Sequence, residues 1–475
     1  MKNYYDDISR YGDVTAIITQ NSEHISYRTL TDVADKLKEV FDSRCLVFCV
    51  VANNLESVVG YIGMLRARVV PVLISPDINK DLFKGLLEAY RPTYIWAPFD
   101  SCLVPSECSR AYKFGDYFLS KTTYVMDYGL HGELAQLLTT SGSTGSPKLV
   151  RQSYKNITSS ADSIATYLSI SQADRPITTL PFNYTYGLSI INSHLLKGSS
   201  IILCNFSVME KPFWDSLKQH SATSFGGVPY TFEILKKLRF ERMNLPSLKT
   251  ITQAGGRLYA ELVKYFSDAC ESKGVDFIVM YGQTEATSRM SYLPSKFAKI
   301  RSNSIGIPIP GGEFWLEDEN GQIILQEGID GELVYKGSNV AMGYASCRQD
   351  LAAGDLNDGV LHTGDIARRD SEDFYYITGR KSRFLKIFGN RVSLDDVEQL
   401  LRAAQYDVAC AGRDDNMEVF VAKGVDAQEV KTFITRQTGL PSASLSIIAV
   451  DSIPRNEFGK ILYADLKNLV AACNN

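Results

Sequence analysis

The sequence predicts an α/β protein with a large N-terminal domain of layered sheets and helices plus a small β unit, followed by a small α+β domain. Three observations predict this class. Apolar runs alternate with helical patterns in the first third of the chain, β-like runs dominate from about residue 305 to 377, and the pattern changes again after residue 377. With 475 residues, the chain is too long for one ordinary domain.

In the first third, strand-like and helix-like segments alternate at the spacing of β-α-β units. The apolar run CLVFCVVA at 45–52 predicts a buried strand, and the pattern at 55–68 predicts a helix. The order strand, helix, strand then continues at 69–75, 77–90 and 93–99. The alternation resumes with expected elements at 156–170 (helix), 176–182 (strand), 187–198 (helix) and 199–206 (strand). Strands separated by helices favour a substantially parallel sheet.

The second half of the chain predicts two further kinds of structure. Short β-like runs indicate a small, mainly β unit and lie at 313–318, 322–326, 331–337 and 374–379. Next comes a candidate linker with five Lys or Arg between Arg380 and Arg391. Ser393 is expected to cap the helix at 393–405. An α+β domain of about 90 residues follows, with elements at 417–424 (strand), 427–439 (helix), 444–450 (strand) and a last helix after 460.

Composition excludes several classes of protein. Hydrophobic residues make up 45% and charged residues 22% of the chain, and the net charge of −4 argues against a general nucleic-acid or membrane-surface binder. The longest apolar run, at 46–52, is far short of a membrane span, and the N-terminus lacks a signal-peptide pattern. The nine cysteines form no C-x-x-C pair, so neither a zinc cluster nor a disulfide framework is indicated. We therefore expect a cytoplasmic protein with no nucleic-acid or membrane partner.

The segment LLTTSGSTGSPKLV at 137–150 has the composition of a phosphate-binding loop. Hydroxyls, glycine backbone and the ammonium of Lys148 suit a phosphate. The usual G-x-x-x-x-G-K-[ST] loop does not fit, because Pro147 and Leu149 stand where Gly and a hydroxyl are required. The residues that follow also favour a strand rather than a helix. By itself, the segment is either a different phosphate loop or a surface turn.

Five further motifs follow this loop, at 251–258, 279–288, 360–365, 377–392 and 454–460. In this order, the set resembles the adenylate-forming (AMP-binding) superfamily, which includes acyl- and aryl-CoA synthetases, luciferases and the adenylation domains of nonribosomal peptide synthetases. The resemblance covers about residues 10–466. It implies an N-terminal domain over 1–379, a hinge at 380–383 and a mobile C-terminal domain over 384–475.

The resemblance also assigns the ATP-binding residues. It implies that the first loop clamps the ATP phosphates through Thr140, Ser141, Gly142, Ser143, Thr144, Gly145 and Lys148. Glycine lets the backbone close on an anion. In YGQTEA it implies that Tyr281 lies near adenine, that Thr284 meets the α-phosphate and that Glu285 ligates Mg²⁺, for which a carboxylate is suitable. Gly255 and Gly256 would let the backbone approach adenine. The alternative for these two motifs is a helix cap and a plain turn.

Asp365, Arg380 and Lys460 complete the implied set. Asp365 would accept hydrogen bonds from the ribose hydroxyls, with Arg380 assisting, and otherwise is a turn residue. Lys460 would bridge the substrate carboxylate and the ATP phosphate, where it would stabilise developing charge together with Thr284 and Glu285. The alternative is an ordinary surface lysine.

The chain departs from the family pattern at the hinge and in the acid pocket. Ser382 stands where the family has Asp or Lys. Asn183 stands where amino-acid-activating members have Asp, and Tyr184 where acyl-CoA synthetases often have His. A neutral amide cannot neutralise a buried ammonium, so we expect a neutral-tailed acid. By resemblance, the pocket is formed by Asn183, Tyr184, Phe225, Gly226 and Gly227, with Tyr186 as a further aromatic wall and open space beside both glycines.

The predicted function is the ATP- and Mg²⁺-dependent, AMP-forming activation of a small carboxylic acid. The acyl group of the adenylate would then pass to a thiol, either CoA or the phosphopantetheine arm of a carrier protein, on a face that includes Gly389 and Arg391. One alternative is a free-standing adenylation enzyme that loads an amino acid or acyl group onto a carrier protein. Another is a non-catalytic nucleotide sensor, against which the intact Glu285, Asp365 and Lys460 argue.

Overall fold

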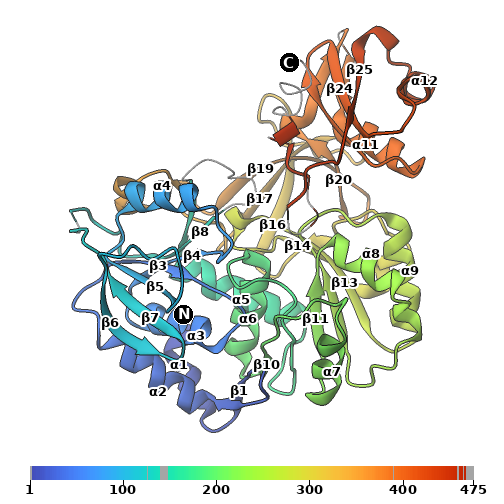
Figure 1. The fold of residues 1–475 in the computed structure, drawn as a ribbon. Coiled ribbons are helices and arrows are strands. Elements are labelled where there is room, and N and C mark those ends of the chain that lie inside the picture. The colour runs from blue at the N-terminus through green and yellow to red at the C-terminus, as the bar shows by residue number, and fades with distance from the viewer. Residues whose placement is uncertain are drawn as a thin grey trace. The chain divides into compact units, whose positions relative to one another are not determined.

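The computed structural model describes residues 3–125, 127–139, 148–388, 390–456, 459, 461–463 and 465–466, with the backbone alone at 382, 384, 390 and 391. The chain divides into two compact units (Figure 1). Unit 1 comprises Met1–Glu313 with Tyr335–Leu361, and unit 2 comprises Phe314–Val334 with His362–Asn475. Each unit is therefore built from two separate stretches of chain.

An eight-stranded sheet forms one half of unit 1. Its strands are β3 (Leu46–Val50), β4 (Val70–Ile74), β5 (Tyr94–Pro98), β6 (Ser109–Phe114), β7 (Tyr117–Lys121), β8 (Leu134–Thr139), β9 (Leu149–Ser153) and β18 (Tyr344–Ala345). They lie in the order β18-β9-β8-β4-β3-β5-β7-β6. β3 pairs in parallel with β4 and β5, and β4 pairs in parallel with β8. The predicted parallel core is confirmed, as is the strand after the phosphate-loop segment.

Helices cover both faces of this sheet (Figure 1). Val47 and Cys49 of β3 face a core that includes α2 (Tyr27–Lys38) and α3 (Leu55–Arg66). Their neighbours Leu46, Phe48 and Val50 face the other core, which includes α4 (Lys80–Tyr90). Every second residue of a strand points to the same face, so a continuously apolar strand needs cover on both sides.

A five-stranded sheet forms the other half of unit 1. Its strands, in spatial order, are β11 (Ser224–Gly227), β12 (Thr250–Gln253), β13 (Asp276–Tyr281), β14 (Ser291–Leu293) and β15 (Ile307–Pro308). The first three are parallel. Their carboxyl ends therefore meet at one edge, which brings the segments after residues 227, 253 and 281 together. Helices α5 (Tyr154–Tyr167) and α6 (Thr185–Lys197) lie between the two sheets (Figure 1).

The remaining elements of unit 1 are shorter. They are α1 (Tyr4–Asp7), α7 (Lys211–Gln219), α8 (Pro229–Lys237), α9 (Ala260–Glu271), α10 (Ser295–Ala298), and the strands β1 (Thr15–Ile18), β2 (His24–Ser26) and β10 (Ile201–Ile202). Two predicted strands are much reduced. The segment 199–206 contributes only β10, and 176–182 contributes isolated bridges at Pro176 and Ile177. One reason is that the Thr178 hydroxyl, rather than a strand carbonyl, accepts the Cys204 N–H at 2.8 Å.

A four-stranded sheet lies largely in unit 2. Its strands, in spatial order, are β16 (Gly312–Glu317), β17 (Gly331–Gly337), β19 (Val360–Arg369) and β20 (Tyr375–Arg380). The predicted β unit is thus confirmed. The strand expected at 322–326 is wrong, because this segment makes a single bridge from Ile323 to Glu317 and leaves Leu325 76% exposed.

The C-terminal part of unit 2 has the predicted α+β character. Its elements are β21 (Phe384–Ile387), β22 (Asn390–Ser393), α11 (Leu394–Ala403), β23 (Val408–Arg413), β24 (Asn416–Ala422), α12 (Ala427–Thr438) and β25 (Leu445–Val450). The Ser393 side chain accepts the Asp396 N–H at 3.2 Å, as expected of an N-cap. The last predicted helix lies mostly outside the described residues, and the hinge at 380–383 stays a prediction.

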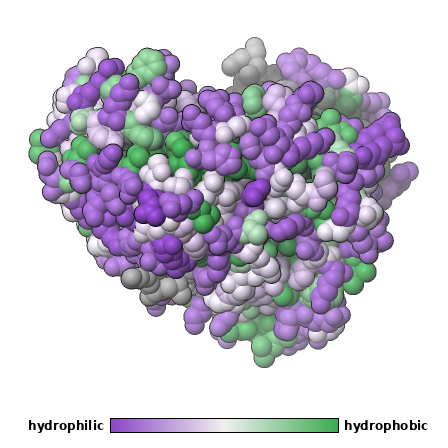
Figure 2. All heavy atoms as spheres, turned by 90° about the horizontal axis from the view of Figure 1, so that it is seen from below, coloured by the Kyte–Doolittle hydropathy of each residue, from purple (hydrophilic) through white to green (hydrophobic). Residues whose placement is uncertain are grey.

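The surface shown in Figure 2 is mostly hydrophilic, with hydrophobic residues in small groups between hydrophilic ones. The longest described helix, α5, has 14 residues. Within the described ranges, no helix has both the length and the apolar character needed to cross a lipid bilayer.

Candidate active site

The loop after β13 carries Tyr281, Thr284 and Glu285. It continues from β13 through a 3₁₀ turn, Thr284–Ala286, to two residues with left-handed backbone, Thr287 (φ 49°) and Ser288 (φ 102°). The loop folds back so closely that a Cβ on Gly282 would lie 1.8 Å from the Ser288 carbonyl oxygen. Only glycine fits there, and non-glycine residues with positive φ concentrate at functional sites.

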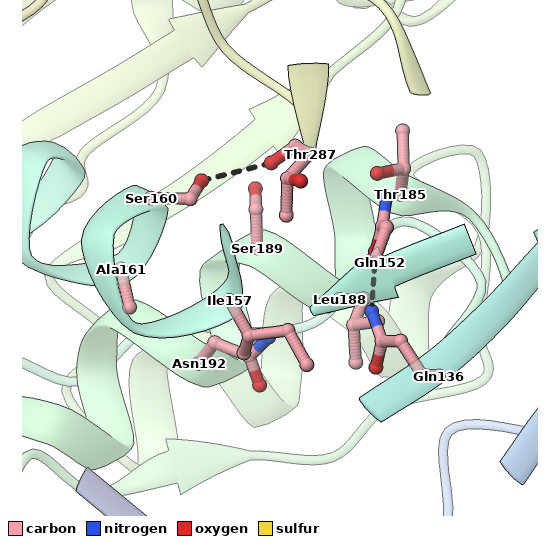
Figure 3. A pocket seen from close by; sticks show the side chains of 10 residues that line it. All are labelled: Gln136, Gln152, Ile157, Ser160, Ala161, Thr185, Leu188, Ser189, Asn192 and Thr287. Carbon is pink, nitrogen blue, oxygen red and sulfur yellow. Dashed lines mark hydrogen bonds between the residues drawn. The ribbon is translucent and has the colours of Figure 1, made fainter. Parts of the chain in front are cut away.

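Three other elements hold this loop in place. Ser160 of α5 donates to the Thr287 carbonyl at 2.8 Å (Figure 3). Gln152 of β9 donates to the Thr284 carbonyl at 3.0 Å. Asn339, after β17, donates to the Ala286 and Arg289 carbonyls at 2.7 and 2.8 Å. Buried main-chain carbonyls are thereby satisfied without a regular strand or helix.

A small cavity lies beside the loop. It is lined by Gln136, Gln152, Ile157, Ser160, Ala161, Thr185, Leu188, Ser189, Asn192 and Thr287 (Figure 3). Its volume of ≈ 10 Å³ is about what one water molecule needs. It is therefore too small for a carboxylic acid substrate.

Glu285, Tyr344 and Lys148 form a continuous chain of contacts. The Tyr344 hydroxyl donates to Glu285 Oε1 at 2.6 Å, and Lys148 Nζ lies 3.5 Å from the centre of the Tyr344 ring. Burial, together with the Glu285 charge, raises the pKa of Tyr344, so this hydroxyl stays protonated and can donate. The structure thus joins the metal-ligand candidate to the lysine of the phosphate-loop segment.

Glu285 suits a magnesium ion. A carboxylate oxygen is a hard ligand, and Mg²⁺ is usually bound by one or two carboxylates together with phosphate oxygens and water. The Tyr344 hydroxyl orients one carboxylate oxygen of Glu285. No cluster of three or more His, Cys, Asp or Glu that could hold a metal occurs in the described part of the chain.

The glycine pair after β12 is tightly packed against Tyr184 at one position. Gly255 has φ +82°, and a Cβ there would lie 2.4 Å from the Tyr184 hydroxyl. A Cβ on Gly256 would meet Pro229 Cγ at 3.1 Å. Gln253 fixes this turn by donating to the Gly256 carbonyl at 2.9 Å. The turn thus brings Tyr184 against the segment predicted to approach adenine.

Tyr184 and Tyr186 lie at the start of α6, with ring centres 6.3 Å apart. The Tyr186 hydroxyl lies 2.9 Å from the Thr252 carbonyl, so it spans from α6 to β12. Burial raises the pKa of Tyr184 to about 12, which keeps it neutral at physiological pH. Asn183 Oδ1 is buried and has no hydrogen-bond partner in the described part of the chain.

The expected open space beside Gly226 and Gly227 is wrong. A Cβ on Gly226 would lie 2.8 Å from the Tyr186 hydroxyl, and one on Gly227 would lie 2.9 Å from Thr231 Cβ. Phe225 packs edge-on against Phe213 and Trp214 of α7. Neighbouring residues of a strand face opposite sides, so Gly226 faces α6 whereas Phe225 and Gly227 face other helices.

Arg289, which directly follows the motif at 279–288, was not predicted from the sequence. Its side chain is 1% exposed, and its guanidinium carbon lies 4.5 Å from the centre of the Tyr186 ring. It also donates to the Tyr167 hydroxyl at 2.9 Å and the Ser189 hydroxyl at 3.1 Å. The signal that could have revealed it is a lone charge two residues before the strand β14.

Asp365 and Arg380 are neighbours in unit 2. They are paired in register between β19 and β20, and Arg380 Nε donates to Asp365 Oδ1 at 2.8 Å. The Asp365 side chain is 3% exposed, whereas that of Arg380 is 49% exposed. Several predicted residues lie outside the described residues, namely Thr140, Ser141, Gly142, Ser143, Thr144, Gly145, Gly389 and Lys460.

Known proteins resemble this chain along most of its length. A 2-succinylbenzoate–CoA ligase of Bacillus velezensis is 28% identical over 348 residues, which is 71% of this chain and 69% of that protein. The ligase of that name from Bacillus subtilis is 28% identical over 70% of this chain and 68% of its own.

Solved structures share the fold. The o-succinylbenzoate CoA synthetase of Bacillus subtilis, solved with ATP and magnesium ion, has a TM-score of 0.80 at 23% identity and covers 98% of this chain and 99% of that chain. MatB from Rhodopseudomonas palustris, bound to ATP, has a TM-score of 0.77 at 20% identity over 100% and 99% of the two chains. The predicted fold class is therefore confirmed.

The sequence model described as AMP-binding enzyme matches residues 5–345. This range contains Lys148, the loop with Thr284 and Glu285, and Tyr344, which the structure brings into one chain of contacts. The predicted superfamily and the prediction that the chain is an enzyme are both confirmed. The chain belongs to the AMP-binding enzyme family.

Proposed function

We propose that the chain is an AMP-forming acid–CoA ligase. The carboxylate of a small acid attacks the α-phosphorus of ATP, which forms an acyl-adenylate and releases pyrophosphate. The sulfur of CoA then attacks the acyl carbon, and AMP leaves. The observation that carries the proposal is the hydrogen bond that holds Glu285 against Tyr344, next to Lys148, in a chain of this family.

The residues of unit 1 serve the first step. Thr284 meets the α-phosphate, Tyr281 lies near adenine, and Lys148 offers its ammonium to the phosphates. Glu285 would hold a magnesium ion, which would supply positive charge to offset the charge developing on the phosphates. Thr284 and Glu285 are well suited because their loop is fixed by Gln152 and Asn339, and a preorganised site loses little energy to reorganisation.

Asp365 is the proposed ribose ligand, with Arg380 assisting. An ionised carboxylate only accepts hydrogen bonds, which matches the two donors of a ribose diol. The guanidinium of Arg380 orients this carboxylate by donating to Oδ1 at 2.8 Å. Lys460, which lies outside the described residues, is proposed to bridge the acid and the phosphate.

The hinge is proposed at Ser382 because its neighbours are anchored in different places. Lys381 pairs with Glu332 of β17 at 2.7 Å. On the other side, Arg383 pairs with Asp395 and with Glu398 of α11, the latter at 2.6 Å. Rotation about residue 382 would leave both sets of ion pairs intact. Such a rotation would exchange the face used for adenylation for the one used for thioester formation.

Acid-dependent exchange of labelled pyrophosphate into ATP tests the first step. Conversion of CoA to a thioester tests the second. We expect exchange with a simple carboxylic acid and thioester formation with free CoA. Thioester on a phosphopantetheinylated carrier protein, with none on CoA, would instead support the carrier-loading alternative. Absence of exchange with every acid and amino acid in the presence of Mg²⁺ would overturn the proposal.

A further inference from the structure

Arg289 is a buried cation with no counterion among the described residues. Its Nη1 contacts the Tyr167 hydroxyl and the Met280 sulfur, and its Nη2 donates to the Ser189 hydroxyl. Nε is buried and has no hydrogen-bond partner. No described carboxylate lies within ion-pair distance of this guanidinium. A buried charge normally has a partner, because removing it from water is costly.

Arg151, also fully buried, shows how this chain satisfies a structural arginine. Its guanidinium donates to four main-chain carbonyls, at Met342, Tyr344, Ala353 and Gly354, with distances from 2.5 to 3.1 Å. Carbonyl oxygens carry partial negative charge, so this arginine needs no acid. Arg289 has no carbonyl partner in the described structure, and its polar partners are neutral hydroxyls and a thioether.

The free edge of Arg289 has the geometry of a carboxylate fork. Nε has no partner, and Nη2 has only one, so one further N–H of Nη2 is available. The Nε and Nη2 edge of a guanidinium binds both oxygens of a carboxylate at once. A second carboxylate is therefore the ligand that this edge fits best.

Arg289 is also placed where this sheet offers a binding site. It follows the loop of Thr284 and Glu285, stacks on Tyr186, and interacts electrostatically with Tyr184. These residues lie at the carboxyl ends of the parallel strands β12 and β13, where ligands of open α/β sheets bind. The neighbouring Ser288 Oγ is likewise buried without a partner.

We propose that Arg289 binds a second carboxylate on the acid substrate, so that the enzyme activates dicarboxylic acids. The inference rests on the proposed function, whose acid pocket it specifies. One carboxylate is activated at the α-phosphate, while the other pairs with the Nε and Nη2 edge of Arg289. This replaces the neutral tail expected from Asn183.

The test compares acids that differ in one carboxylate. Wild-type pyrophosphate exchange is measured with 2-succinylbenzoate and with 4-oxo-4-phenylbutanoate, which lacks the ring carboxylate, and with glutarate and its monoamide. We expect kcat/KM to be roughly 100-fold higher for the better dicarboxylate than for the matched acid that lacks its second carboxylate. Arg289→Gln should abolish that preference, and Arg289→Lys should keep part of it.

Thermal unfolding separates this role from a structural one. If the Arg289 guanidinium only supported the fold, Arg289→Gln would lower the unfolding temperature of the protein, as Arg151→Gln should. A guanidinium kept for a ligand should leave the unfolding temperature unchanged or raised, because an unpaired buried charge is removed. If Arg289→Gln does not fold, the wild-type ratios still decide. Equal or greater exchange with the monocarboxylic acids would overturn the inference but leave the ligase function standing. Absence of exchange with every acid would overturn the ligase function itself.

Discussion

At the scale of single residues, Tyr344 links two functional groups that lie far apart in sequence. It donates to Glu285 and supports Lys148 through its ring. Neither contact is visible in the motif at 279–288, because residue 344 lies 59 positions from residue 285. Tyr344 is therefore a positioning residue for Glu285, the proposed magnesium ligand.

Tyr344→Phe should lower kcat/KM for pyrophosphate exchange about tenfold and raise the Mg²⁺ concentration needed for half-maximal rate. A hydrogen bond to a charged group contributes about 1.5 kcal/mol or more. The matched control is Tyr406→Phe, which removes a 3.0 Å bond to Glu429 in unit 2. An unchanged Mg²⁺ dependence in Tyr344→Phe would contradict the positioning role.

Asp365→Asn should raise the KM for ATP about tenfold and leave the fold intact, because the proposed contacts are to ribose. Asp330→Asn is the control, since Asp330 accepts from Arg368 Nε at 3.0 Å in the same unit but at an exposed position. The KM for ATP should not change in the control. A variant at 365 that unfolds, or one with wild-type ATP dependence, would show that Asp365 is only a turn residue.

At the scale of elements, α6 contains a histidine that is buried in its neutral form. His194 is 5% exposed, and its Nδ1 lies 2.8 Å from the Ile190 carbonyl. Burial lowers its pKa from 6.5 to about 4. The unfolded chain takes up a proton below pH 6.5, but the folded chain does so only near pH 4. Stability is therefore full above pH 6.5 and is lost as the pH falls toward 4.

Urea unfolding at pH 7 and pH 5 tests this effect. Between these values, the free energy of unfolding of the wild type should fall by about 2 kcal/mol more than that of His194→Gln, which does not titrate. The glutamine can still donate to a carbonyl, so the helix keeps a similar bond. Equal pH dependence of the two proteins would show that His194 has the same pKa in the folded and unfolded states.

Elements with strong patterns were predictable from the sequence, and residues joined by long-range contacts were not. The buried strands near residues 45–52 and 69–75 were predicted because a short, continuous apolar run between two helical patterns is typical of a strand buried on both faces. Asp365 and Arg380 came from a motif and proved to be paired. Arg289 was not predicted because its proposed role depends on the side chains packed around it, which are distant in sequence. The open space expected at Gly226 was wrong because the Tyr186 hydroxyl, 40 positions away in sequence, occupies it.

At the scale of the whole molecule, the proposal requires two conformations that use different residues. Lys460→Ala should reduce adenylation at least tenfold more than the transfer of a supplied acyl-adenylate to CoA. The reason is that the lysine acts only while phosphate charge develops. Lys423→Ala, which removes an exposed pair with Asp451, is the control and should change neither step. Equal loss in both half-reactions would contradict the two-conformation mechanism.

A change of register between β18 and β9 would alter the position of side chains outside this pair of strands. β18 contains only two residues, with Tyr344 opposite Val150 and Ala345 opposite Leu149. Slippage by one position would turn the Tyr344 side chain to the opposite face of the sheet. Arg151 resists slippage because it donates to the carbonyl of Met342, just before this strand, and to that of Tyr344 within it. The position of Glu285, which is distant in sequence, thus depends on the register in which β18 pairs with β9.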